Sequence, residues 1–285
     1  MLLRLFSSFL LLLLPATGFT QGSVYHDISR ALEDPKDVRV LKITFKIIEN
    51  LPDVFDEFEN LEELNLNNNY ISQLPPSLFK CKKLKKLNLS KNQIGNLPEA
   101  IGQLQNLQHL ILSYNKLSSL PDSIVYLSKL IELDVKGNQL VALPDSIQHL
   151  SKLKDLYLSK NQLNKLPDSI AQLSRLSMLD LSDNILEKLP EDIGLMKGLQ
   201  FLYLTRNRLS VIPESIGRCE NLQELDVVYC GCLYLPQSLA ILPKLDLVFL
   251  DERITCFVPN ASNRFRQKFI VIDRENTFYR TMHNY

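Results

Sequence analysis

Histidine and glycine are scarce in this chain, and neither sign of charge is in excess. Its 285 residues include four histidines and nine glycines, against 32 Lys plus Arg and 32 Asp plus Glu. The histidines fall at unrelated positions, and the sequence shows no Ser/His/Asp set, metal-spaced cluster or glycine-rich phosphate loop. We therefore expect a protein that is not an enzyme and binds no cofactor or metal. The balanced charge gives no indication of a nucleic-acid partner.

Long hydrophobic runs are also absent, apart from one near the amino terminus. The run Leu5–Leu14 is shorter than the roughly 20 residues that a membrane-spanning helix needs. It follows an arginine and precedes a proline and small residues, which is the arrangement of a secretory signal peptide. We expect residues 1–22 to be this signal, cleaved between Gly18 and Gly22, with a retained anchor as the alternative. No cysteine lies near the cleavage region for a lipid anchor, so the expected location is secreted or periplasmic/cell-envelope.

A five-residue sequence, Leu-Pro-Asp-Ser-Ile, occurs three times at a spacing of 23 residues, beginning at Leu120, Leu143 and Leu166. A fixed period of this size is typical of architectures that stack one structural unit. Aligning the chain on the leucine ahead of each motif gives ten units of 23 residues. They start at Val38, Leu61, Leu84, Leu107, Leu130, Leu153, Leu176, Leu199, Leu222 and Leu245.

Within each unit the pattern LxxLxLxxNxLxxLPxxIxxLxx indicates a short strand, a turn and a short helical segment. Leu110 and Leu112 flank Ile111, so the two leucines point to one face of a strand. Pro121 suits the first position of a short helix or 3₁₀ turn, with Ile124 on its inner side. One unit buries little by itself, whereas stacked units bury these positions continuously. The sequence therefore predicts an α/β solenoid.

This pattern resembles the leucine-rich repeat family, and its period is similar to that of plant intracellular Ras-group and bacterial exported leucine-rich repeat proteins. The resemblance implies a horseshoe with a parallel β-sheet on the concave face and short helices or 3₁₀ turns on the convex face. It covers residues 38–255 as about ten repeats. It also implies a non-enzymatic module that binds a protein or peptide on the concave face. A signalling scaffold of the Ras-group type is an alternative that conflicts with the signal peptide.

The segments on either side of the repeats are predicted to cap the solenoid. Residues 23–37 have apolar side chains at near-helical spacing and suggest an N-terminal cap helix. Residues 256–285 are rich in aromatics and free of repeats, and the run Phe269–Ile272 within them suggests a capping strand. Both segments would cover the exposed ends of the core. The oligomeric state is left open.

Asparagine recurs at one position in seven units. A carboxamide carries both a donor and an acceptor, so it can pair backbone groups of neighbouring turns that would otherwise be buried without a partner. We therefore expect a structural ladder rather than a polar active row. Its members are Asn69, Asn92, Asn115, Asn138, Asn161, Asn184 and Asn207.

The cysteines also have structural interpretations. Cys81 and Cys219 share a repeat position otherwise held by apolar residues, so we expect small core side chains there. Cys232 and Cys256 lie almost one unit apart, which would place them roughly 5 Å from each other in adjacent coils. In an oxidising compartment these two residues are the candidates for a disulfide that closes the C-terminal end.

The residues beside the core leucines define a candidate binding face. From Asp134 to Phe249, aspartate and aromatic residues alternate between the two strand leucines. Nothing in the coil requires these aromatics, and exposed aromatics near an arginine are typical of binding hot spots. The acidic residues favour a basic or amphipathic partner segment, and a glycan is the alternative because aromatic platforms edged by carboxylates also suit sugars. The predicted partner-binding residues are Tyr157, Asp180, Phe201, Tyr203, Arg206, Asp226, Tyr229 and Phe249.

Overall fold

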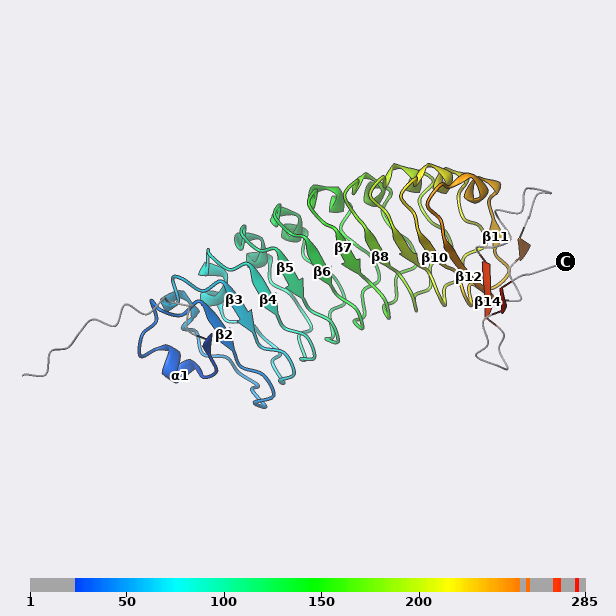
Figure 1. Cartoon of the computed structure of the whole chain (residues 1–285). Helices are drawn as coiled ribbons and strands as arrows, with labels where there is room; N and C mark the ends of the chain where they lie inside the picture. Colours follow the sequence, from blue (N-terminus) through cyan, green and yellow to red (C-terminus); the bar gives the residue numbers. More distant parts are fainter. Residues whose placement is uncertain (1–23, 252–254, 257–268, 273–279, 282–285) are drawn as a thin grey trace, which may run out of the picture.

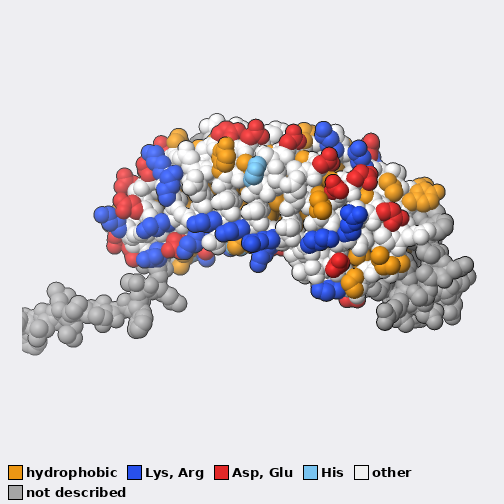
Figure 2. All heavy atoms as spheres, turned by 90° about the horizontal axis from the view of Figure 1, so that it is seen from above, with side chains coloured by type: hydrophobic (Ala, Val, Ile, Leu, Met, Phe, Trp, Pro, Cys, Tyr) orange, Lys and Arg blue, Asp and Glu red, His pale blue; other side chains and the backbone are white. Residues whose placement is uncertain are grey.

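The computed structural model describes residues 24–251 and the backbone of three short strands farther along the chain. The expected signal segment lies outside the described residues. The described coils stack side by side into an open solenoid (Figure 1), which is arched when it is seen from above (Figure 2). A sheet of short strands follows the concave side of this arch, as the family resemblance implied.

The main sheet has thirteen strands in the described part of the chain. All neighbouring pairs are parallel except the last, β14 with β15. Its members are β1 (Val24–Tyr25), β2 (Val40–Lys42), β3 (Glu63–Asn65), β4 (Lys86–Asn88), β5 (His109–Ile111), β6 (Glu132–Asp134), β7 (Asp155–Tyr157), β8 (Met178–Asp180), β9 (Phe201–Tyr203), β10 (Glu224–Asp226), β12 (Leu247–Asp251), β14 (Phe269–Ile272) and β15 (Arg280–Thr281). A second sheet pairs β11 (Tyr234–Leu235) with β13 (Thr255–Cys256).

Short helical segments cross the opposite side of the coils. They are α1 (Ile28–Ala31) and the 3₁₀ helices η1 (Phe55–Glu57), η2 (Pro76–Lys80), η3 (Glu99–Gln103), η4 (Asp122–Tyr126), η5 (Ile147–His149), η6 (Asp168–Gln172), η7 (Ile193–Leu195), η8 (Glu214–Arg218) and η9 (Gln237–Ile241). The proline of the motif was expected at the first helical position, but in η4 Pro121 is the N-cap, with φ −68° and ψ 150°. Its backbone is extended there, and Asp122 takes the first position instead.

The register between strands repeats the sequence period. Leu64 pairs with Leu87, Leu87 with Leu110 and Leu110 with Leu133, and each of these pairs is 23 residues apart. The leucine at the centre of each strand from β2 to β10 therefore lies directly above the one before it. Residues on either side of it face away from the core and form rows that run across these strands.

One continuous core fills the space between the sheet and the 3₁₀ helices. In the fourth coil, for example, Leu107, Leu110, Leu112, Leu117 and Ile124 are all fully buried. The same positions are buried in the coils on either side, so the cluster extends through the described repeats without interruption. Cys81 and Cys219 are part of it, and burial raises the pKa of their thiols to about 12 and about 11.

The seven ladder asparagines are buried and link consecutive coils. Asn138 illustrates the pattern: its Nδ2 donates to the carbonyl oxygens of Leu112 and Val135 at 3.0 and 2.9 Å. Its Oδ1 accepts from the backbone N–H of Leu117 at 3.0 Å. One carboxamide thus satisfies three buried backbone groups, two of which belong to the preceding coil. At the C-terminal end of the ladder, Cys230 replaces asparagine and its thiol lies 3.1 Å from the carbonyl oxygen of Leu204.

Both ends of the described solenoid depart from the repeat. At the N-terminal end, α1 begins after Asp27, whose side chain accepts from the backbone N–H of Arg30 at 3.2 Å. At the other end, the strand expected at Phe269–Ile272 is present as β14 and pairs with β12. None of the helices in the described residues is long and apolar enough to span a bilayer.

Candidate interaction surface

The register brings the alternating aspartate and aromatic residues into one row on the concave sheet. Asp134 pairs with Tyr157, Tyr157 with Asp180 and Asp180 with Tyr203. The row continues through Asp226 to Phe249. These side chains are half-buried, and neighbours in the row are separated by about 4.8 Å, the distance between strands. The sequence prediction that they share one face therefore agrees with the strand register.

A second row, two residues earlier in each strand, adds more acidic and apolar groups. Phe201 lies between Met178 and Glu224, and Leu247, next in the row, is exposed. Asp155 pairs with Glu132 on the neighbouring strand. These two carboxylates were missed among the predicted site residues, although they occupy the same repeat position as Phe201. We call the combined surface the acidic–aromatic patch, defined by Glu132, Asp134, Asp155, Tyr157, Asp180, Phe201, Tyr203, Glu224, Asp226 and Phe249.

The aspartates of the first row also have a structural role. Asp134, Asp180 and Asp226 each accept a hydrogen bond from the backbone N–H two residues later, at 3.0 to 3.1 Å. Asn65 and Asn88 accept the same hydrogen bond in the N-terminal half of the sheet. Short polar side chains commonly stabilise turns in this way. The turn therefore explains why this position is polar. It does not explain the negative charge, because the neutral Asn65 and Asn88 make the same hydrogen bond.

Burial and clustered negative charge shift the titration of the patch. Burial raises the pKa of Asp226, and burial together with the charge of Glu132 raises the pKa of Asp155. Burial and then the charge of Glu224 raise the pKa of Tyr203 to about 12. Each shift disfavours further negative charge at this surface. Burial is the largest cause of each shift, and repulsion by the neighbouring carboxylates adds to it.

Arg206 and Tyr229 lie at the edge of this surface rather than within its strand rows. Both follow the strands in loops and have left-handed backbones, with φ of 55° and 59°. The Arg206 guanidinium lies 5.8 Å from the centre of the Tyr229 ring and its Nη1 lies 3.3 Å from Oδ1 of Asp183. The structure thus places the two residues together, on the rim that borders the patch.

The N-terminal half of the concave sheet is polar and internally paired. Lys42 lies 3.5 Å from Glu63, and at the border with the patch Nδ1 of His109 lies 2.9 Å from Oε2 of Glu132. Pairs of this kind that remain accessible to solvent contribute little to stability. This half lacks the aromatic row, so the acidic–aromatic patch occupies the C-terminal half of the described sheet.

The cysteine register differs from the one expected for a disulfide. Strand β13 pairs with β11 so that Cys256 lies opposite Leu235, three residues beyond Cys232. Cys232 is exposed and has a free thiol. The side chain of Cys256 lies outside the described residues. In the part of the chain with described side chains, no group of three or more His, Cys, Asp or Glu residues is arranged to hold a metal ion.

Comparison with known families identifies the fold. A family model described as a leucine-rich repeat region matches residues 78–159 and 145–246, and a second leucine-rich repeat model matches residues 36–94. These matches cover well over half of the chain. The chain belongs to the leucine-rich repeat family. The family and the fold are typically those of non-enzymatic modules for protein–protein interaction.

Solved structures of several leucine-rich repeat proteins resemble this one. A leucine-rich repeat protein of Leptospira interrogans is 34% identical, with a TM-score of 0.77 over 83% of this chain and 60% of its own. The ectodomain of the Arabidopsis thaliana membrane receptor kinase GASSHO1/SCHENGEN3, in complex with Casparian strip integrity factor 2, is 29% identical, with a TM-score of 0.70 over 81% of this chain and 28% of its own.

An internalin from Listeria monocytogenes shares the fold at 22% identity, with a TM-score of 0.73 over 85% of this chain and 70% of its own. This leucine-rich repeat chain thus spans less than two thirds of the Leptospira protein and less than a third of the receptor ectodomain. A search of curated proteins found no match.

Proposed function

We propose that this leucine-rich repeat protein is an exported module that binds an extended polypeptide on its concave face. The acidic–aromatic patch is the contact surface, and the partner is a basic or amphipathic segment. The observation that carries the proposal is the alternation of Asp180, Tyr203, Asp226 and Phe249 across four neighbouring strands. Half-buried aromatics supply apolar contact area, and the carboxylates between them favour lysine or arginine.

The solved structures that resemble this chain support a protein or peptide as the partner. The Arabidopsis ectodomain was solved in complex with Casparian strip integrity factor 2. The signal-like segment at residues 1–22 supports export. Arg206 and Tyr229 at the rim would contact the partner where it leaves the sheet.

The test is a selection of linear peptides on the immobilised protein, followed by affinity measurements with matched variants. We expect the selected peptides to combine lysine or arginine with apolar residues. Replacing both Tyr157 and Tyr203 with alanine should weaken binding at least about tenfold, because buried aromatics dominate interface energetics. The control replaces Tyr70 and Tyr126, which are 50% and 65% exposed and lie outside the patch.

A charge-only variant separates electrostatics from shape. Asp180→Asn with Asp226→Asn keeps an oxygen that can accept the backbone hydrogen bond, as Asn65 and Asn88 do naturally. It should weaken binding of basic peptides and reduce its dependence on salt. Equal affinity of the patch and control variants would remove the patch from the mechanism. Neutral oligosaccharide binding that is lost in the Tyr157/Tyr203 variant would instead favour the glycan alternative.

A further inference from the structure

A second surface, distinct from the acidic–aromatic patch, runs along the flank where each strand begins. We call this surface the turn flank. In each repeat it consists of three residues: the two turn residues before the opening leucine and the one residue after it, which for Leu84 are Lys82, Lys83 and Lys85. It covers the six repeats that start at Leu84, Leu107, Leu130, Leu153, Leu176 and Leu199. Figure 2 looks onto this side of the molecule and shows Lys and Arg side chains gathered along one of its edges. The flank holds eight cations and no Asp or Glu: Lys82, Lys83, Lys85, Lys129, Lys152, Lys154, Arg175 and Lys197.

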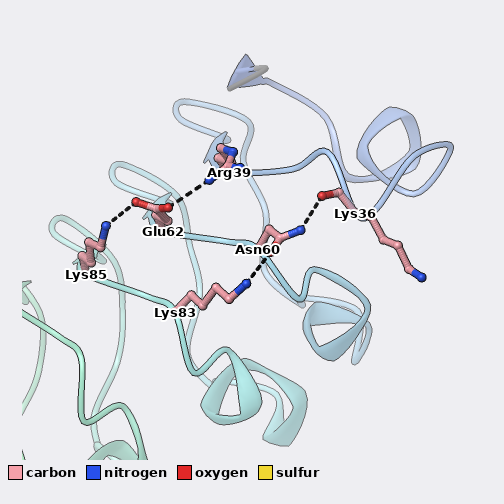
Figure 3. Close-up of polar contacts among 6 residues, drawn as sticks. All are labelled: Lys36, Arg39, Asn60, Glu62, Lys83 and Lys85. Atoms are coloured by element: carbon pink, nitrogen blue, oxygen red, sulfur yellow. Dashed lines mark hydrogen bonds and ion pairs between the residues drawn. The ribbon is translucent and has the colours of Figure 1, made fainter. Parts of the chain in front are cut away.

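This segregation contrasts with the balanced charge of the whole chain. All eight side chains are exposed. Of these eight cations, only Lys85 forms an ion pair with another residue of the described chain: its partner Glu62 lies 2.6 Å away and also contacts Arg39 at 3.2 Å (Figure 3). A carboxylate thus neutralises a flank cation at the N-terminal end of the flank. The repeats from Leu107 to Leu199 have no Asp or Glu at the flank positions.

Neutral amides hold some of these lysines without cancelling their charge. Nζ of Lys83 donates to Oδ1 of Asn60 at 2.6 Å, and Asn60 in turn donates to the carbonyl oxygen of Lys36 (Figure 3). Lys129 makes the same contact with Asn106 at 2.5 Å. An amide oxygen orients the ammonium group but carries no net charge. The contacts thus keep the cations in register along the flank.

The three cations at the centre of the flank form its strongest part. Lys129, Lys152 and Arg175 occupy the same turn position in three consecutive coils. Neighbouring coils are about 4.8 Å apart at the sheet, well within the roughly 8 Å over which physiological salt screens a charge. Their fields therefore reinforce one another. In the described chain, the side chains of Lys152 and Arg175 form no ion pair or side-chain hydrogen bond.

The other residues of the flank indicate the class of partner. They are serines, glutamines, one asparagine, one glycine and the half-buried Ile131. A flank without aromatics lacks the stacking platforms that single-stranded nucleic acids use. With a single apolar side chain, it also lacks the anchors of a protein hot spot. Cations interspersed with hydroxyl and amide groups match a polymer that carries both acidic groups and many hydroxyls.

We propose that the turn flank binds an anionic polysaccharide laid along the solenoid. Its sulfate or carboxylate groups contact Lys129, Lys152 and Arg175, and its hydroxyls bond to side chains such as Ser151 and Ser174. From the repeat at Leu84 to that at Leu199 the flank spans five coil spacings, about 24 Å, enough for several consecutive sugars. The proposal does not depend on the concave-face proposal, because the two surfaces share no residue.

Binding of dextran sulfate, with unmodified dextran as the matched neutral polymer, tests this proposal on the full chain. We expect the wild-type protein to bind dextran sulfate and polygalacturonate and to ignore dextran. Affinity should fall steeply between about 0.05 and 0.2 M salt, because binding releases counterions. Replacing Lys129, Lys152 and Arg175 with glutamine should weaken binding about tenfold and reduce the log–log salt slope by about two.

The control replaces Lys91, Lys116 and Lys160 with glutamine, which changes net charge equally on the loops that follow the strands. Circular dichroism of both variants checks that the fold is retained. The proposal is overturned if the two variants bind dextran sulfate equally. It is also overturned if the protein prefers phosphatidylglycerol vesicles or single-stranded DNA to the sulfated polymer at the same salt concentration.

Discussion

Single side chains carry the inter-coil hydrogen bonding of this leucine-rich repeat protein. The ladder asparagines each serve backbone groups that would be buried without a partner, and the row of aspartates and asparagines at the strand ends stabilises the turn that follows. Both positions are polar for structural reasons. The coil needs a polar residue at the second position, but it does not need a negative charge there. It also does not need the aromatic residues that alternate with the aspartates.

Asn138→Ala tests the ladder. The change leaves the N–H of Leu117 and the carbonyl groups of Leu112 and Val135 without their side-chain partner. We expect a loss of about 2–4 kcal/mol in the free energy of unfolding, measured by urea denaturation, because each buried unsatisfied group costs about 1–3 kcal/mol. Asn164→Ala, at an exposed position, should change it by less than about 0.5 kcal/mol. Equal effects of the two changes would contradict the assigned role.

The ionisation of Tyr203 tests the electrostatics of the acidic–aromatic patch. Burial and then the charge of Glu224 should hold the pKa of its phenol at about 12, above the usual 10, and Glu224→Gln should lower that pKa by removing this charge. The ultraviolet difference titration between the wild type and Tyr203→Phe isolates this group. The control Glu220→Gln removes a charge from an exposed turn and should leave the titration unchanged. A pKa that Glu224→Gln leaves unchanged would show that the charge of Glu224 does not act on this phenol.

At the scale of elements, each coil is shaped by close backbone contacts between turns and 3₁₀ helices. The loop after the strand reverses at a left-handed residue in successive coils, such as Asn68, Lys91 and Tyr114, with φ of 57°, 53° and 56°. In the next coil the position is held by Gly137, against which the Tyr114 ring packs. The 3₁₀ helices approach one another closely enough that some positions have no room for a side chain.

Gly194→Ala tests this packing. A Cβ atom at Gly194 in η7 would lie 2.0 Å from the backbone oxygen of Ser215, which precedes the centre of η8. Because backbone atoms must move to accommodate it, we expect destabilisation of about 1–3 kcal/mol in urea denaturation. At Gly95 a Cβ would meet nothing within 4 Å, so Gly95→Ala should be neutral or stabilise by about 0.5 kcal/mol. The reverse order of stabilities would contradict the packing.

At the scale of the whole molecule, the solenoid is a stack in which each coil contacts its neighbours. Paired residues of neighbouring strands are always 23 residues apart in these repeats. If one internal coil were removed, the coils on either side of it could therefore pair with each other in the same register. Stability then depends on the number of coil interfaces rather than on long-range contacts between the ends. The two proposed surfaces follow the same logic, because each extends over several coils.

Deleting one complete repeat tests this modularity. Removing residues 84–106 joins Lys83 to Leu107 and brings β3 beside β5 with the leucine register intact. We expect a folded protein whose urea m-value falls by roughly a tenth, because one unit of ten no longer exposes its surface on unfolding. The acidic–aromatic patch is untouched, so peptide affinity should be retained.

A contrasting deletion of residues 84–95 supplies the control. It removes about half a repeat and places polar residues at core positions of the junction. This variant should unfold or lose cooperativity, as judged by circular dichroism. If both deletions behave alike, the coils are not interchangeable units.

Much of the architecture was predictable because the determinants of a coil are local and recur. The spacing of Leu107, Leu110 and Leu112 indicated a strand with one buried face, and its repetition indicated stacking. The expectation that Tyr157 and Tyr203 lie on one sheet face followed from the same period. The acidic contribution of Glu132 and Asp155 was missed because these residues lie in the first half of a row whose aromatics appear only later.

The sequence by itself determined the repeat, the strand register and the identity of the core, because each coil makes the same contacts as the one before it. Only the tertiary structure decided which polar side chains accept hydrogen bonds from turns, as Asp180 does. It also decided which side chains of different coils come into contact, as Arg206 and Tyr229 do. It also decided the end of the stack, where Cys256 aligns with Leu235 rather than Cys232. The physical reason is that these outcomes depend on loop conformations and on departures from the period, which a repeating pattern of apolar residues does not encode.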